Sequence, residues 1–252
     1  MIRGLFTSAS GMLAESMRND VTANNLANIN TTGYKKDVTV FKSFPEVLIQ
    51  RINDQKKTDP QPQVNIGTLG TGAIVDEIIT SHEQGQFMET SSNFDLAIEG
   101  EGYFTVQNQR GIFYTRNGAF TIDSQGYLVN SQGDYVLGQA GPIQIGNVSD
   151  VRVDEAGNIF VDGGDEPAAA LRIVSIVNKA ALAKVGDSLF TGGQVGGTVG
   201  QVRQKFLEIS NVNPVHEMVN MITIARAYEA NQKVVTALDQ SLAQAVEVGT
   251  VK

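Results

Sequence analysis

The feature that most constrains this chain is a long helical pattern near its C-terminus. Apolar and small residues there follow one another at strict intervals of three and four, the spacing of a helix face that packs against other helices. These positions are Met221, Ile224, Tyr228, Asn231, Val235, Leu238, Leu242 and Ala245. A second apolar row lies beside the first, at Met218, Ile222 and Ala225. We expect a helix of roughly 30 residues, whose two rows cover more surface than one partner helix would bury.

The start of this helix is marked by Asn213 and Pro214. Asparagine is a favoured N-cap residue, and proline is favoured at the first helical position. Glu217 follows in the first turn, where a carboxylate interacts well with the positive end of the helix dipole. The pattern therefore predicts a terminal helical segment over residues 214–252.

A weaker pattern of the same kind lies near the N-terminus. Small or apolar residues recur at steps of four and three, at Leu5, Ala9, Met12, Ser16, Asn19, Ala23 and Leu26. Asparagine, threonine and glycine then accumulate up to Gly33 and favour turns over continued helix. We expect the N-terminal helical segment to lie within residues 1–33. The asparagines at 24, 25, 28 and 30 are expected to satisfy backbone groups where this helix ends.

Between the helical segments, the pattern changes to short β runs separated by glycine turns. Residues 103–106 and 112–115 flank a turn-forming stretch and predict a hairpin. Asp-x-x-Gly turns at 123–126 and 154–157 each stand between two apolar runs. These features predict a mostly antiparallel β domain over residues 87–190.

The expected fold class is α+β, with long terminal helices forming a coiled-coil assembly region around a central, mostly antiparallel β domain. An extended connector with short strands is expected at 34–86 and a glycine-rich return connector at 191–213. An alternative is that the helices pack on each other and on the β domain, which would close the core of a monomeric binding module.

Composition and motif spacing argue against several classes of function. A formal net charge of −8 and a pI of about 4.8 disfavour a nucleic-acid binder. The chain has no cysteine, which excludes disulfides and thiolate zinc sites. His82 and His216 each precede a glutamate but lack a second histidine at zinc-protease spacing. We therefore expect no metal, no cofactor and no small-molecule substrate.

An enzyme built on paired carboxylates remains a weak alternative. Asp95 and Glu99 would share one face of an ideal strand. They would lie on the order of 13 Å apart along that strand. Glycosidase carboxyl groups are separated by only about 5–9.5 Å. We expect no catalytic residues.

Six stretches in three regions of the chain resemble a known family. The N-terminal stretches 8–12 and 23–35, the central stretches 94–104 and 114–118, and the C-terminal stretches 207–213 and 226–231 are similar to bacterial flagellar basal-body rod and hook proteins. The family-motif positions are Ala23, Asn24, Asn25, Leu26, Ala27, Asn28, Asn30, Thr31, Gly33, Tyr34, Ser210, Asn211, Val212, Asn213, Arg226, Tyr228 and Asn231. The resemblance covers nearly the whole chain and is weak only at about 41–81.

The resemblance implies a structural subunit of the flagellar rod, the axial shaft that carries torque from motor to hook. Members of this family are exported unfolded by the flagellar type III apparatus, without a cleaved signal peptide, and polymerise across the periplasm and cell wall. The implied partners are copies of the chain, other rod and hook proteins, the export apparatus and the bushing rings around the rod. The stretch 41–72 matches neither the proximal nor the distal rod type, so the subtype stays open.

The resemblance and the helical rows together predict an assembly interface. We expect the C-terminal helix to pack against the N-terminal helix of the same or an adjacent subunit. The residues expected to form the interface are Leu5, Ala9, Met12, Leu26, Met218, Met221, Ile222, Ile224, Tyr228, Val235, Leu238 and Leu242.

Overall fold

The computed structural model describes residues 2–44, 46–51, 64–146, 148, 150–161, 163–164, 166–186, 188–197 and 199–250. Two compact units divide the chain. Unit 1 comprises Met1–Asn24, Val38–Ile79 and Val215–Lys252, and unit 2 comprises Asn25–Asp37 and Thr80–Pro214. Each unit is thus assembled from segments that are far apart in the sequence. Residues 52–63 of the expected connector lie outside the described residues.

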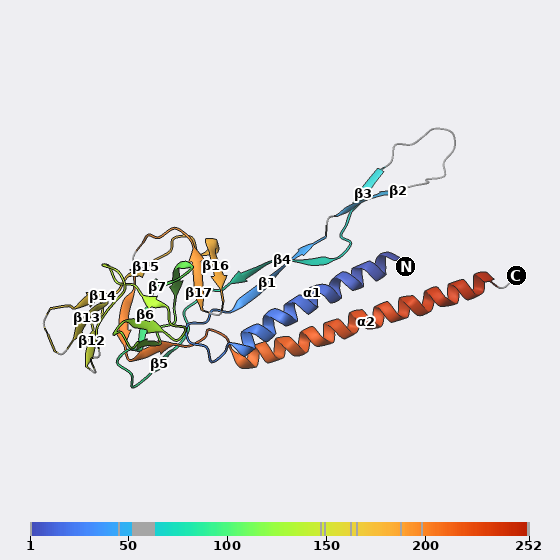
Figure 1. Ribbon diagram of the computed structural model, residues 1–252. Coiled ribbons are helices and arrows are strands. Elements are labelled where there is room, and N and C mark those ends of the chain that lie inside the picture. The colour runs from blue at the N-terminus through green and yellow to red at the C-terminus, as the bar shows by residue number, and fades with distance from the viewer. Residues whose placement is uncertain are drawn as a thin grey trace. The chain divides into compact units, whose positions relative to one another are not determined.

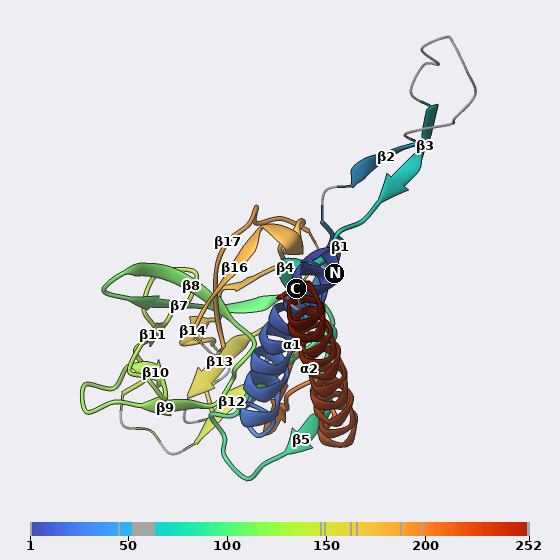
Figure 2. The same cartoon turned by 90° about the vertical axis from the view of Figure 1, so that its right-hand side faces the viewer.

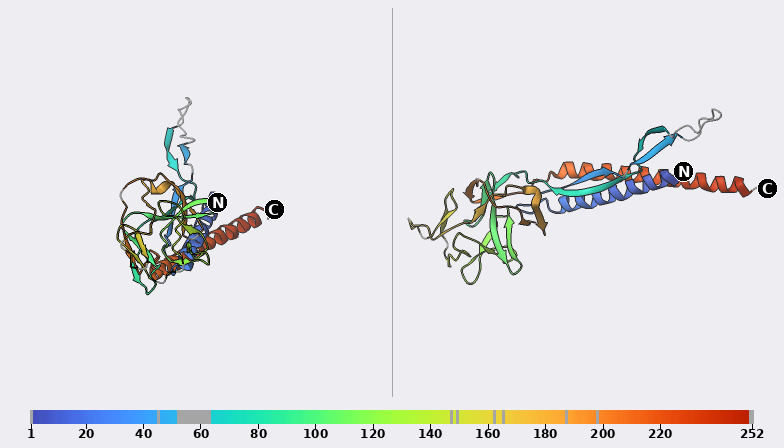
Figure 3. Two further views of the ribbon diagram at one scale, coloured as in Figure 1. Left: turned by 60° about the vertical axis from the view of Figure 1, so that its left-hand side comes forward. Right: turned by 90° about the horizontal axis from the view of Figure 1, so that it is seen from above.

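Unit 1 contains most of the two long helices, α1 (Ile2–Ala27) and α2 (Pro214–Thr250). The predicted N-terminal helix and the predicted helix start at Pro214 are both confirmed. The two helices lie side by side and run in opposite directions (Figure 1, Figure 3). Among the described residues, no helix combines the length and apolarity that a membrane span requires.

Two glycines of α1 lie against α2. A methyl group on Gly4 would lie 3.1 Å from Leu238 Cδ1, and one on Gly11 would lie 3.0 Å from Asn231 Nδ2. The two contacts are seven residues apart on each helix, which is about two helical turns. The helices therefore keep an antiparallel register over these turns, with small α1 residues allowing close approach.

The other described residues of unit 1 include an extended β ribbon. Strands β1 (Asp37–Ser43) and β4 (Ala73–Thr80) pair at its base, and β2 (Val47–Arg51) pairs antiparallel with β3 (Val64–Leu69) further out. Figure 1 shows the β2–β3 pair continuing beyond the β1–β4 pair. The connection between β3 and β4 is attached to α1 by Thr7, whose hydroxyl donates a hydrogen bond of 2.8 Å to the Thr71 carbonyl.

Unit 2 is built around an eight-stranded antiparallel sheet (Figure 2). This confirms the predicted antiparallel β-rich centre, including the hairpin of β7 and β8. In sheet order the strands are β16 (Leu182–Val185), β17 (Leu189–Gly192), β8 (Gly111–Thr115), β7 (Tyr103–Asn108), β11 (Tyr135–Val136), β10 (Leu128–Asn130) and β9 (Phe120–Ile122), with β15 (Ile173–Val174) also on β7. A three-stranded sheet follows, made of β12 (Val151–Val153), β13 (Asn158–Val161) and β14 (Ala169–Ala170). A short 3₁₀ helix, η1, spans Lys179–Ala181.

Three turns of unit 2 share one construction. The side-chain Oδ1 of the first residue accepts hydrogen bonds from the N–H groups two and four residues later. The first residues are Asp123, Asn130 and Asp154. The glycine three residues after each has φ of 84° or 85°, a backbone conformation that glycine adopts without strain. Two of these turns are predicted by their Asp-x-x-Gly sequences, and the third begins with asparagine in place of aspartate.

The segment 191–213, expected as a return connector, contributes two strands to unit 2. Strand β18 (Gln201–Gln204) pairs with β6 (Leu96–Glu99), and β19 (Phe206–Glu208) pairs with β5 (Phe87–Glu89). The glycine-rich stretch 192–200, which directly precedes β18, concealed the strand pattern of residues 201–208. Val202 and Leu207 are buried, so the segment completes the core of the unit.

Candidate assembly site

The first two turns of α2 carry an exposed apolar row on unit 1, which we call the outer row. Its members are Val215, Met218, Val219 and Ile222, with exposed fractions of 69, 52, 58 and 56%. At about 100° per residue, Ile222 lies roughly 160–200° around the helix from Ile224, Asn231 and Leu238. Since Asn231 and Leu238 lie against α1 and Ile224 is buried, the outer row faces away from α1.

The predicted interface residues of α2 fall into two groups. Ile224 is buried, and Met221, Val235, Leu238 and Leu242 are partly buried on the side facing α1. Met218 and Ile222 belong to the outer row, and Tyr228 is 38% exposed. One row therefore packs within the chain, while the other is open to a neighbour.

On α1, the expected row runs beside two glycines that lie against α2. Leu5, Met12 and Leu26 are partly buried, and Ala9 is exposed. Gly4 and Gly11, each one position before an expected residue, approach α2 closely. Glycine gives no hydrophobic signal, which is why a search for apolar spacing passes over it.

A second apolar surface of unit 1 was not predicted. A hollow of about 530 Å³ lies beside α1 and the base of the β ribbon, with Phe6, Leu13 and Phe44 exposed along it. Its remaining lining residues are Arg3, Ala9, Ser10 and Thr71. The spacing of seven residues between Phe6 and Leu13 was the available signal, but such spacing also suits an ordinary helix face packed in a core.

In unit 2, the N-terminal and C-terminal family motifs meet around one buried carboxylate. Glu208 is 1% exposed. Its Oε1 accepts hydrogen bonds from Lys35 Nζ at 2.5 Å and from the Gly85 N–H at 2.8 Å, and its Oε2 accepts one from Arg116 Nη1 at 3.2 Å. We call these four residues the Glu208 cluster. Buried charges of this kind are tolerated because they are paired and hydrogen-bonded.

Motif residues next to the cluster tie the two ends of the chain together. The Gly33 N–H donates to the Glu208 carbonyl at 2.8 Å. Asn25 accepts from the Asp37 N–H and donates to the Asp37 carbonyl, so these two bonds go to the start of β1 and not to the end of α1. Asn211 Oδ1 accepts from the Lys36 N–H at 2.8 Å. The family motifs of unit 2 are therefore structural contacts.

His82 also has a structural role. Its Nδ1 lies 2.9 Å from the Tyr103 hydroxyl, and its ring packs against Phe190. Burial lowers the pKa of His82 from its usual 6.5 to about 4, and the charges of Lys179, Lys35 and Arg116 act in the same direction. Burial also raises the pKa of Tyr103 to about 12.

The pKa of His82 predicts acid sensitivity of unit 2. Between pH 6.5 and about 4, the unfolded chain binds a proton on His82 that the folded chain does not, so stability falls as pH falls through this window. The loss should be on the order of 1–2 kcal/mol after solvent screening. His82→Gln should remove this loss of stability, which is measured as the difference between the denaturation midpoints at pH 7 and pH 4.5. His216→Gln, at the other histidine, should keep the wild-type slope, and equal slopes in both variants would contradict the assignment.

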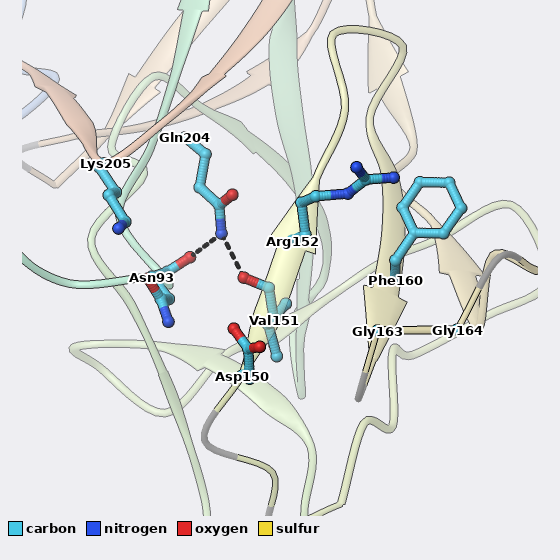
Figure 4. A pocket seen from close by; sticks show the side chains of 9 residues that line it. All are labelled: Asn93, Asp150, Val151, Arg152, Phe160, Gly163, Gly164, Gln204 and Lys205. Carbon is cyan, nitrogen blue, oxygen red and sulfur yellow. Dashed lines mark hydrogen bonds between the residues drawn. The ribbon is translucent and has the colours of Figure 1, made fainter.

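The described residues offer no evident catalytic constellation. They contain no group of three metal-ligating side chains. The pocket in Figure 4 is crossed by Gln204, whose Nε2 donates to the Asn93 carbonyl at 2.8 Å and the Val151 carbonyl at 2.6 Å. Glu99, one of the two carboxylates considered above, pairs with Arg203 at 3.4 Å. These polar groups join strands to one another.

Comparison with known families gives three matches along the chain. Residues 5–35 match "Flagella basal body rod protein", residues 97–161 match "Flagellar hook protein FlgE/F/G D1 domain", and residues 203–248 match "Flagellar basal body rod FlgEFG protein C-terminal". The first and third matches contain the two terminal motifs identified in the sequence.

Curated relatives match over nearly the full length. Flagellar basal-body rod protein FlgG of Borreliella burgdorferi is 34% identical over 96% of this chain and 97% of its own. FlgG of Caulobacter vibrioides is 32% identical over 96% and 97%, respectively. Flagellar hook-basal body complex protein FlhO of Bacillus subtilis is 27% identical over the whole of both chains.

Proposed function

This chain belongs to the flagellar basal-body rod protein family, and we propose that it builds the rod by polymerising through its two terminal helices. It is a structural subunit of the bacterial flagellar basal body, with a role in motility, and not an enzyme. Membership of the family supports interaction with other flagellar rod and hook proteins. The surface through which the chain would polymerise is proposed from the exposed side chains of α2.

The observation that carries the proposal is the outer row of α2. Four large apolar side chains are more than half exposed on a helix whose opposite side already packs on α1. Burying such a row against a neighbouring helix is favourable because it removes apolar surface from water. A contact between different faces of identical subunits generates a helical polymer when its rotation does not close into a ring. The coiled-coil core of the rod would then combine the α1–α2 contact with outer-row contacts between subunits.

We extend the proposal to the export of the chain and to the torque that it carries in the rod. The chain would be exported unfolded by the flagellar export apparatus, without a cleaved signal peptide, and would assemble across the periplasm inside the bushing rings. In the rod it would transmit torque from motor to hook. Membership of the rod family is the support for each of these steps.

A second candidate is a monomeric module closed by its own helices. It is favoured by one observation, the packing of Leu238 and Asn231 against α1 of the same chain. Sedimentation of the purified protein at rising concentration separates the two candidates. Rod assembly predicts growth into long particles and rapid proteolysis of helical ends in the unassembled chain. A monodisperse particle with protected ends would support the closed module.

Leu238→Asp should abolish polymerisation and swimming while leaving unit 2 folded. The carboxylate would enter the α1–α2 contact beside Gly4, where an unpaired charge costs several kcal/mol. Leu238→Met conserves volume and apolarity and should retain both properties. Swimming in soft agar, with near-UV circular dichroism of the tyrosines as the fold check, measures the outcome. Normal swimming of cells that carry only Leu238→Asp would contradict the proposal.

A further inference from the structure

Two buried cations of unit 2 depend on Glu208. The side chains of Lys35 and Arg116 are 1% and 5% exposed. Among the described residues, Glu208 is the carboxylate with which either forms an ion pair. Their further hydrogen bonds go to backbone carbonyls, from Lys35 to Glu83 and from Arg116 to Ile98 and Gly100. Burial lowers the pKa of Lys35, and the charge of Glu208 opposes that shift.

The chain order separates the cations from their counter-charge. Glu208 lies 173 residues after Lys35 and 92 residues after Arg116. The strands from β5 to β17 also precede it. Until Glu208 arrives, the folded arrangement would bury two like charges with no carboxylate, and breaking a buried ion pair in this way is strongly destabilising.

The last strands reinforce this dependence. Strands β18 and β19 pair with β6 and β5, which come more than a hundred residues earlier in the numbering for each paired position. Val202 of β18 belongs to the same core cluster as Ile98 of β6 and Phe104 of β7. Neither the charge balance nor the complete core of unit 2 can therefore form without the segment 201–208.

We infer that the Glu208 cluster acts as a folding lock, which keeps unit 2 open until residue 208 has been delivered and seated. A partly synthesised or partly threaded chain then lacks the folded unit, although it already contains most of the residues of that unit. This inference goes beyond the proposed assembly role, because it concerns a single chain and holds whether or not the chain polymerises.

Glu208→Gln in the full chain tests the lock. Glutamine offers one acceptor oxygen where the carboxylate offers two, and its NH₂ group would face another donor. Hydrogen exchange should then accelerate by at least about a hundredfold in β7 and β8 as well as in β18 and β19. Acceleration confined to 201–214, with β7 and β8 protected as in the wild type, would overturn the inference.

Two further variants distinguish a lock from general damage. Lys35→Met combined with Glu208→Gln restores the net charge of the cluster and should regain at least about tenfold of the lost protection. Glu99→Gln, an exposed carboxylate on β6 that pairs with Arg203, should keep wild-type exchange throughout. No recovery in the double variant would mean that charge balance is not what holds unit 2 closed.

The order of folding can be followed during synthesis of the full chain. Brief proteolysis at intervals after synchronised translation should yield a resistant unit 2 fragment only from chains that have passed residue 208 and cleared the ribosome. A resistant fragment containing β7 to β9 from chains that end before residue 199 would refute the lock. Wild-type and Glu99→Gln chains should behave alike.

Discussion

Alanine in place of Gly33 is expected to destabilise unit 2 by about 3 kcal/mol or more. Gly33 has φ of +67°, a conformation that strains a residue with a side chain. An added Cβ would also lie 2.3 Å from the Asn117 nitrogen and 2.5 Å from the Arg116 carbonyl carbon. Both are backbone atoms of unit 2, so they cannot rotate away, and the Gly33–Glu208 hydrogen bond would be disturbed as well.

Gly133→Ala is the matched control for Gly33→Ala. Its φ is +85°, but nothing lies within 4 Å of the added Cβ. Only conformational strain of about 1 kcal/mol is expected there. Chemical denaturation monitored by tyrosine circular dichroism measures both, since the chain has six Tyr and no Trp. Equal losses in the two variants would show that backbone crowding at Gly33 is not the cause.

Ile222→Asp is expected to prevent rod assembly without disturbing the isolated chain. Ile222 is 56% exposed and faces away from α1, so a carboxylate there is solvated in the monomer. In a helix interface the same carboxylate would be buried at a cost of several kcal/mol. Each 1.4 kcal/mol is a tenfold change in affinity, so the concentration needed for polymerisation should rise by at least about a hundredfold.

Gln240→Asp introduces the same aspartate on α2 outside the outer row, and it is the control for Ile222→Asp. Residue 240 is 18 positions after Ile222, which is five full helical turns, so it points in the same direction. It is exposed and has no apolar row around it. Sedimentation of purified protein and swimming of cells carrying each variant compare the two positions. Retained assembly in Ile222→Asp, or equal loss in Gln240→Asp, would argue against the outer row as the contact surface.

The helices could be predicted from the sequence because periodic apolar residues and an Asn-Pro start are local signals. Strand pairing within 103–115 was local as well. The residues that set the α1–α2 contact could not be found this way, since Gly4 and Gly11 act through their lack of a side chain. The outer row was only partly predicted, because the second apolar row included Met218 and Ile222 but not Val215 and Val219.

The Glu208 cluster lay beyond local reasoning for a different reason. Lys35, Arg116 and Glu208 are far apart in the chain, and each looks like an ordinary surface charge in its own neighbourhood. The pairing of β19 with β5 positions Glu208, and the hydrogen bond from the Gly33 N–H brings the Lys35 segment beside it. The family motif contained Gly33 and Tyr34 but gave no physical reason for them, and the hydrogen bonds of unit 2 supply that reason.

The division of the chain into two interleaved units has a mechanical consequence. The backbone passes from one unit to the other after Asn24, Asp37, Ile79 and Pro214. A load that travels from either unit to the other is therefore shared by four covalent segments rather than carried by a single tether.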